Sequence, residues 1–294
     1  MSAVSAAEVA EASVVRKRRF AIPGLRATGA IGHVSAVVVA VAVVVAIVGP
    51  YIAPHDPDVT NLQFAFVGRY QDHYLGFDSQ GRDIVSRLLV GARTSLLGPL
   101  VVVALAMLFG ITIAIASAWR GGRFDTIVSA GLDVLFAFPA IMLAIIAAVV
   151  WGAGLAAASV ALSIAYMPYV ARVLRGAALR ERSRDYVAAL EVQGLRASVI
   201  CLRHITRNLV PLISAQAAIL FGYAMVDLAA ISFIGLGVQP PHADWGVMVA
   251  TGQSGVLQGY PMEAASAGIC IVVIVIAVNL LGERLTDRAS EAQR

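Results

Sequence analysis

Apolar and polar stretches alternate along this chain on the length scale of membrane-spanning helices. A helix needs about 20 apolar residues to cross a hydrocarbon core of roughly 30 Å. Runs of this kind occur at residues 31–52, 95–119, 126–151, 153–171, 209–237 and 263–282. The pattern therefore predicts an all-α membrane protein with six transmembrane helices.

The third and fourth runs adjoin each other, with Gly152 and Gly154 at the junction. One continuous helix through both runs would be about 45 residues long and would far exceed the thickness of a bilayer. Because glycine commonly marks turns, the junction predicts a tight hairpin between two spans.

Composition and charge placement support a membrane protein. The chain is 59% hydrophobic and only 14% charged, with a mean hydropathy of +0.82, which is unlike a soluble domain. The net charge of +4 comes from basic residues that flank the apolar runs, whereas a nucleic-acid binder would gather them on one face with aromatic residues. Because basic segments are retained in the cytosol, their positions predict that both termini are cytosolic.

These features divide the chain into segments. The expected order is a cytosolic N-terminal tail (1–30), a first transmembrane helix (31–52), an extracytoplasmic segment (53–94), a transmembrane domain (95–282) that includes a cytosolic loop (176–208), and a cytosolic C-terminal tail (283–294). The basic run from Arg16 to Arg19 precedes an apolar stretch longer than a signal-peptide core, which indicates an uncleaved anchor.

The sequence lacks motifs for catalysis and for metal or cofactor binding. A P-loop requires a lysine in G-x-x-x-x-G-K-[ST], and the only lysine is Lys17 in the N-terminal tail. Cys201 and Cys270 have no zinc-site spacing. The histidines fall on both sides of the predicted membrane, which argues against a shared metal site. They are His33, His55, His73, His204 and His242.

Two acids lie inside predicted spans, Asp133 in the third and Asp227 in the fifth. Acids in a membrane are costly and commonly face a cavity or a partner. One interpretation is a proton-coupled secondary transporter in which these acids carry protons along the pathway. The other is structural: Asp133 reaches Arg123 or water, and Asp227 hydrogen-bonds to a neighbouring helix.

The loop before the fifth span is rich in arginine and too polar to remain in hydrocarbon. Gly194 favours a turn between two helical pieces. Val192, Leu195, Val199 and Leu202 recur at helical spacing. They form either an apolar ridge for a partner protein or a face that packs on the chain's own helix ends.

Several segments resemble the permease subunits of ATP-binding-cassette importers for dipeptides, oligopeptides and nickel, in particular the C-type subunit. They are HYLGFDSQGRDIVSRLLVGARTSLL (73–97), GLDVLFAFPAIMLAI (131–145), MPYVARVLRGAAL (167–179), ISFIGLGVQPPHADWGVMV (231–249) and VNLLGERLTD (278–287). The segments follow the order of the family along the chain. The resemblance implies a type I importer permease fold.

In that family the loop before the fifth span carries an E-A-A…G signature followed by R-H…P-N. The counterparts here are Asp185, Tyr186, Val187, Ala188, Ala189, Leu190, Gly194, Arg203, His204 and Asn208, and the expected coupling loop also includes Leu195 and Arg196. Ala188 stands where the family usually has Glu, and Arg207 replaces the Pro. The resemblance implies a short coupling helix that docks on a cytosolic ATPase.

The resemblance also implies function and partners. The chain would be a non-catalytic permease subunit that imports di- or oligopeptides across the bacterial inner membrane, with nickel or another small solute as the alternative. Its partners would be a paralogous permease subunit, ATPase subunits that hold ATP and Mg²⁺, and an extracytoplasmic solute-binding protein. Residues 53–79 and the 240–261 loop, with His242, Asp244 and Trp245, are expected either to meet that protein or to form a solvated cap.

Overall fold

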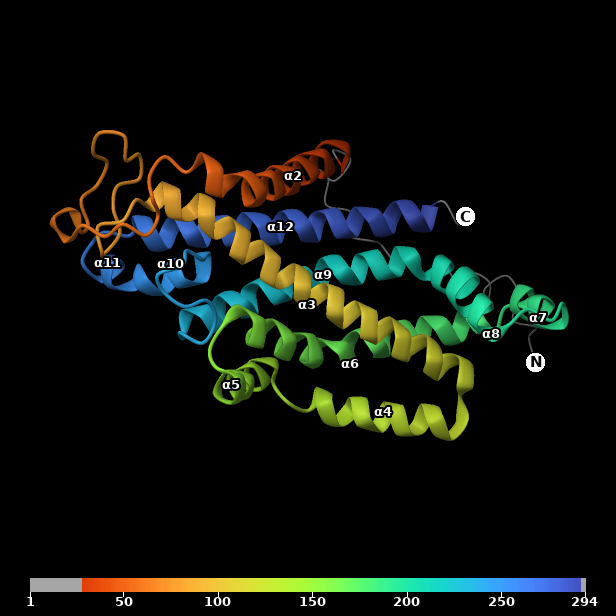
Figure 1. Ribbon diagram of the computed structural model, residues 1–294. Coiled ribbons are helices and arrows are strands. Elements are labelled where there is room, and N and C mark those ends of the chain that lie inside the picture. The colour runs from red at the N-terminus through yellow and green to blue at the C-terminus, as the bar shows by residue number, and fades with distance from the viewer. Residues whose placement is uncertain (1–27, 292–294) are drawn as a thin grey trace, which may run out of the picture.

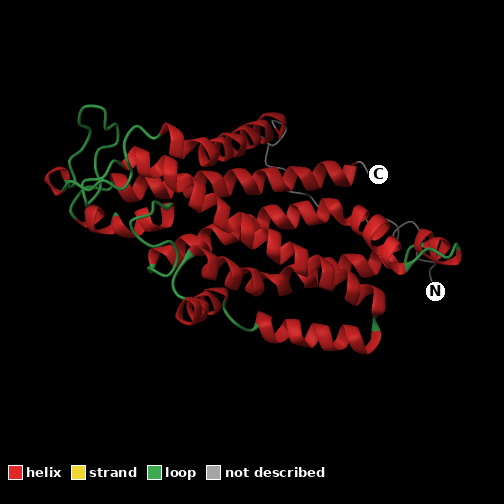
Figure 2. Ribbon diagram, in the orientation of Figure 1, coloured by secondary structure: helices red, strands yellow, loops and turns green. Residues whose placement is uncertain are grey.

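The computed structural model describes residues 28–291, and most of the predicted N-terminal tail lies outside the described residues. The described chain folds into helices and connecting loops, and it contains no strand (Figure 2). The elements are α2 (Thr28–Ile52), η2 (Leu62–Phe64), α3 (Ile84–Arg120), α4 (Gly122–Phe136), α5 (Ala140–Trp151), α6 (Leu155–Arg182), α7 (Asp185–Val192), α8 (Ala197–Val199), η3 (Ile200–Ile205), α9 (Thr206–Phe233), α10 (Trp245–Thr251), α11 (Gln253–Leu257) and α12 (Met262–Glu291).

Within residues 28–291, five helices are long and apolar enough to cross a membrane, and a bent pair of shorter helices supplies a sixth candidate. The bent pair is α4 and α5, which meet at 81°. The prediction of one continuous helix over 126–151 is therefore wrong. Pro139 lies at the break, just before α5, and proline favours such a break because it lacks the N–H that a continuous helix uses there.

Other helices extend beyond the apolar runs. Helix α3 begins at Ile84, well before the expected start at residue 95, because Asp83 caps it by accepting the Ser86 N–H at 2.7 Å. Helix α12 continues to Glu291, so the predicted C-terminal tail is helical as far as it is described. An apolar run measures the hydrocarbon-compatible part of a helix, whereas caps determine where the helix begins and ends.

The predicted hairpin between the third and fourth spans is confirmed. Gly152 follows α5 with a φ of +88°, in the left-handed region that favours glycine. The N–H of Gly154 then donates to the carbonyl of Leu236 at 3.1 Å, after α9. The turn is thus fixed to the segment that follows α9.

Helix α3 runs along α6 and forms the most extensive helix contact in the described chain. A Cβ on Gly110 of α3 would come within 2.6 Å of Val170 Cγ1 on α6, so only glycine permits this close crossing. Helices α2 and α12 expose Val41, Ile47, Ile269 and Val273. Exposed apolar side chains on long helices suit a surface that faces lipid.

The polar connections gather at the two ends of an elongated bundle (Figure 1). The loop from residue 53 to 83, α10 and α11 lie at one end, and α7 and α8 lie at the other. This separation agrees with the predicted alternation of segments. We call these the outer end and the inner end, following the predicted orientation.

Candidate functional site

A short helix projects at the inner end, where the sequence predicts a coupling element (Figure 1). Helix α7 has Asp185 in its first turn, where a negative charge favours the positive end of the helix dipole. Gly194 follows with a φ of +77° and returns the chain toward α8 and α9. The segment therefore forms a helix, a glycine turn and a second helical piece.

A buried carboxylate joins α7 to α6 and α9. Glu181, only 7% exposed near the end of α6, accepts hydrogen bonds from Tyr186 Oη at 2.9 Å and Asn208 Nδ2 at 2.7 Å. Arg184 Nε lies 3.1 Å from its second oxygen. Burial and then the hydrogen bond to Glu181 raise the pKa of Tyr186 to about 12, so this phenol stays a neutral donor near pH 7.

Sequence reasoning found two members of this network, Tyr186 and Asn208, and missed the acceptor between them. The sequence signal that could have found Glu181 was that it is the single glutamate in the arginine-rich segment RERSRD. A carboxylate there is expected to pair, because an unpaired buried charge is costly. Its contacts hold α7 against α6 and α9.

The proposed apolar ridge divides into exposed and packed residues. Val192 is 90% exposed and Leu202 is 72% exposed, whereas Leu195 packs against the inner-end core that includes Val187 and Ile200. The docking interpretation therefore fits the first two residues, and packing on the chain's own helices describes Leu195. Of the remaining expected coupling-loop residues, His204 and Leu190 are half-buried, and the exposed ones are Asp185, Ala188, Ala189, Gly194, Arg196, Arg203 and Asn208.

Arg182 links this region to α3. Its Nη1 donates to the carbonyl of Ala118 at 2.7 Å and also to that of Trp119, and its guanidinium lies 4.9 Å from the Trp119 ring centroid. These carbonyls belong to the last turn of α3, where a positive charge is favourable. The inner end of α3 is thereby bound to the end of α6, next to α7.

A hollow of about 380 Å³ opens at the bend between α4 and α5. It contains the predicted intramembrane acid Asp227, which accepts a hydrogen bond from Tyr166 Oη at 2.5 Å. The hydrogen bond to a neighbouring helix that the structural interpretation expected is thus present. The other lining residues are mainly aromatic: Phe136, Phe138, Ala140, Ala165, Tyr169 and Tyr223.

Asp133 has a separate partner. Arg172 Nη2 lies 2.5 Å from Asp133 Oδ1, and the same guanidinium is 4.7 Å from the Phe136 ring centroid. The expected partner, Arg123, is therefore replaced by an arginine on α6. Because Asp133 pairs with an arginine and Asp227 with a tyrosine, the structure gives each acid a local role and does not link them as a relay.

The outer loop after α9 differs from expectation. Asp244 and Trp245, considered as contacts for another protein, are only 5% and 4% exposed. Asp244 accepts hydrogen bonds from Ser95 Oγ and from the N–H groups of Gly246 and Val247. Burial raises its pKa against the opposing effect of these bonds. Both side chains fasten α10 to α3, and His242 is the exposed member of the three.

Charged residues around the start of α3, in the predicted extracytoplasmic segment 53–94, also make structural contacts. Arg82 Nε lies 2.6 Å from Asp78 Oδ2. Arg87, which is fully buried, donates to the carbonyls of Pro57 at 3.0 Å and Pro241 at 3.3 Å. It therefore fixes two distant outer segments on the start of α3.

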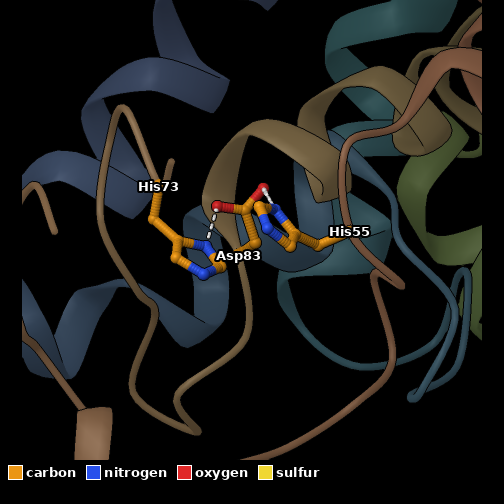
Figure 3. Close-up of side chains that lie close together, drawn as sticks. All are labelled: His55, His73 and Asp83. Carbon is orange, nitrogen blue, oxygen red and sulfur yellow. Dashed lines mark hydrogen bonds and ion pairs between the residues drawn. The ribbon is translucent and has the colours of Figure 1, made fainter. Parts of the chain in front are cut away.

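Histidines also meet at the outer end. His55 and His73 stack with ring centroids 3.9 Å apart, beside Asp83 (Figure 3). The expectation that the histidines are dispersed is wrong for this pair. The two histidines are eighteen positions apart, and the loop between them folds back so that their rings meet. Their spacing in the sequence did not reveal this contact.

Comparison with known proteins identifies the family. A family model described as the binding-protein-dependent transport system inner membrane component matches residues 95–292. The chain belongs to this family. A second model, the N-terminal transmembrane domain of oligopeptide transport permease C, matches residues 31–72.

The relatives of this chain are named as permease proteins of transport systems. A putative peptide transport system permease protein of Brucella suis is 37% identical over 261 residues, which cover 87% of this chain and 85% of the relative. A probable D,D-dipeptide transport system permease protein of Escherichia coli is 35% identical, covering 86% and 85%. A glutathione transport system permease protein of Pectobacterium atrosepticum is also 35% identical, covering 85% and 82%.

The fold has a solved counterpart. A chain from the MetNI methionine ABC transporter, in an inward-facing conformation, superposes with a TM-score of 0.57 at 20% identity. The match covers 69% of this permease and 96% of that chain. At this identity the likeness concerns the fold, and it confirms the expected importer permease fold.

Proposed function

We propose that this chain is the permease subunit of an ATP-driven peptide importer and forms half of its translocation pathway. The family match over residues 95–292 carries the proposal. The named relatives favour peptides over nickel, because their names specify peptide, D,D-dipeptide and glutathione transport. The local partners of Asp133 and Asp227 do not favour proton coupling.

In the proposed assembly the chain sits in the bacterial inner membrane beside a paralogous permease subunit. Cytosolic ATPase subunits bind ATP and Mg²⁺, and an extracytoplasmic binding protein delivers the peptide. Helix α7 and the exposed side chains Val192 and Leu202 dock in a groove of an ATPase subunit. When ATP binding draws the ATPase subunits together, α7 moves, and its contacts through Glu181 and Arg182 transmit that motion to α6, α9 and α3.

Docking can be tested without disturbing the fold of this chain. Val192→Asp and Leu202→Asp each place a carboxylate at an exposed apolar position of the inner end. Both variants should reach the membrane and lose copurifying ATPase and peptide-stimulated ATP hydrolysis. The matched control is Leu257→Asp, since Leu257 is 83% exposed at the outer end. Unchanged ATPase association in both inner-end variants would contradict the docking role.

The hollow around Asp227 supports a proposal for peptide contact. A carboxylate among Tyr166, Tyr169, Tyr223 and Phe136 suits an ammonium group, since aromatic faces and a carboxylate both attract cations. We assign Asp227 as a transient contact for the free amino terminus of a passing peptide. The bent α4–α5 connection forms one wall of this path.

A transport assay separates this contact from a structural role. Asp227→Asn should slow uptake of a free dipeptide and leave uptake of its N-acetylated form less affected, because only the first carries an ammonium group. Asp133→Asn is the control, since Asp133 pairs with Arg172 and does not line the hollow. Equal losses for both peptides in Asp227→Asn would assign the acid to helix packing.

A further inference from the structure

Three metal-ligating side chains converge at the outer end, away from the coupling segment and the Asp227 hollow. His55 follows α2, His73 lies in the next loop, and Asp83 caps α3. Figure 3 shows both imidazoles beside the one carboxylate. One ligand atom from each residue lies within 4.8 Å of the other two.

The hydrogen bonds of this cluster are incomplete. His73 Nδ1 lies 2.8 Å from Asp83 Oδ1, but His55 Nδ1 is 3.9 Å from Asp83 Oδ2. Within the described chain this buried His55 nitrogen makes no hydrogen bond. A simple histidine–aspartate pair therefore explains His73 and leaves His55 Nδ1 without a hydrogen-bond partner, which is costly for a buried nitrogen.

The surroundings leave room for an ion. The three side chains lie on the wall of a hollow of about 380 Å³, to which Asp56 also contributes. Asp83 is 2% exposed, whereas His73 is 19% and His55 is 34% exposed. The carboxylate is thus fixed in the interior, and the imidazoles form the side that solvent can reach.

We propose that His55, His73 and Asp83 bind a divalent transition-metal ion, with Zn²⁺ as the preferred ion. Two imidazoles and one carboxylate are a common zinc ligand set, which leaves a fourth position for water. Bonds of about 2.0 to 2.1 Å in a tetrahedron place ligand atoms roughly 3.3 Å apart. His73 Nδ1 lies 2.8 Å from Asp83 Oδ1 and His55 Nδ1 lies 3.9 Å from Asp83 Oδ2, one below and one above that value. Rotation of the two partly exposed rings would bring the ligand atoms into position around the ion.

Bound Zn²⁺ would replace the His73–Asp83 hydrogen bond and supply the missing partner of His55. Because the ligands come from the segment after α2, the following loop and the start of α3, the ion would fasten the outer loop to the bundle. The backbone N–H of His55 already donates to Ser86 Oγ at 3.0 Å in α3. The site is independent of the proposed peptide transport, because it lies outside the Asp227 hollow.

Metal binding is measured on the purified full-length chain with its copurifying subunits, using an affinity tag free of histidine. After chelator treatment, Zn²⁺ is titrated in competition with a chromophoric chelator, and Co²⁺ absorption reports the coordination geometry. His55→Gln and His73→Gln should each weaken Zn²⁺ binding at least about tenfold, since even the loss of an outer contact to a metal ligand costs 10- to 100-fold. The intense Co²⁺ bands of a tetrahedral site should disappear with them.

His242→Gln is the matched control, because His242 is exposed at the same end and outside the cluster. It should bind Zn²⁺ like the parent chain. His55→Gln removes no hydrogen bond made by the ring nitrogen Nδ1, so helicity and elution volume should also match the parent. A parent chain that binds no Zn²⁺, or a His55→Gln chain that binds it equally well, would overturn the proposal.

Discussion

Replacing Glu181 tests whether the inner-end network holds the coupling helix in place. Glu181→Ala removes the carboxylate that accepts hydrogen bonds from Tyr186 and Asn208. Hydrogen bonds to a charged group contribute about 1.5 to 3 kcal/mol each. Asn208 is exposed and still reaches Tyr186 Oη at 3.1 Å, so water and this remaining bond offset part of the loss.

From the strength of hydrogen bonds to charged groups, we therefore expect Glu181→Ala to weaken the packing of α7 against α6 and α9 by about 2 to 4 kcal/mol. At 1.36 kcal/mol per factor of ten, this loss lowers the ratio of packed to detached α7 by roughly 30- to 900-fold. Glu181→Gln keeps an acceptor oxygen and similar volume, so its effect should be about 1 kcal/mol. Glu181→Ala should therefore weaken the packing of α7 more than Glu181→Gln does.

Amide hydrogen exchange on the solubilised permease measures the effect directly. Peptides covering residues 185–195 should exchange much faster in Glu181→Ala, slightly faster in Glu181→Gln, and at the parent rate in Glu191→Ala. Glu191 is the matched control because it is exposed on the same helix. In the assembled importer, faster exchange should accompany weaker peptide-stimulated ATP hydrolysis. Parent-like exchange in Glu181→Ala would refute the role of the network.

Three further predictions concern other contacts. Gly110→Ala should destabilise the detergent-solubilised protein by about 1 to 3 kcal/mol in thermal unfolding, because its Cβ would overlap Val170. Gly131→Ala is the control: its Cβ meets no described atom within 4 Å, so it should not destabilise the protein. Asp244→Ala should cost about 2 to 4 kcal/mol because it leaves three donors unpaired, two of them buried. His242→Ala should change stability by less than about 0.5 kcal/mol. The difference in tyrosinate absorbance between parent and Tyr186→Phe should show a phenol that ionises near pH 12. Since this pKa is raised above the ordinary value of about 10, its stabilising effect is full below pH 10 and is lost as the pH rises through 12.

The sequence predicted the helical class, the hairpin at Gly152 and a short helix before Gly194, because each depends on local properties. The length of an apolar run and the preference of glycine for a turn depend only on residues close together in the sequence. The same local reasoning missed the bend at Pro139, since the apolar run continues through it. It also placed the start of α3 too late, because the capping carboxylate of Asp83 lies among polar residues.

The candidate sites were less predictable because their contacts are distant in sequence. Asp244 looked like a surface acid until Ser95, far away along the chain, was seen to donate to it. Arg87 looked like a loop charge, although it binds carbonyls of Pro57 and Pro241. No periodicity predicts such pairings, and only the folded arrangement of the outer end identifies which polar residues are structural.

These long-range contacts bear on how a permease could transmit motion. At the outer end, Ser95 of α3 donates to Asp244, which caps α10, and at the inner end Arg182 of α6 donates to carbonyls in the last turn of α3. Glu181 then ties α6 to α9 through Asn208. Helices linked in this way are expected to move together, because separating them breaks these polar contacts. Relative motion should then concentrate at the bent α4–α5 connection, whose ion pair between Asp133 and Arg172 is exposed and easily remade. The Asp227 hollow lies at that connection, so a push on α7 would alter the space available to a peptide there.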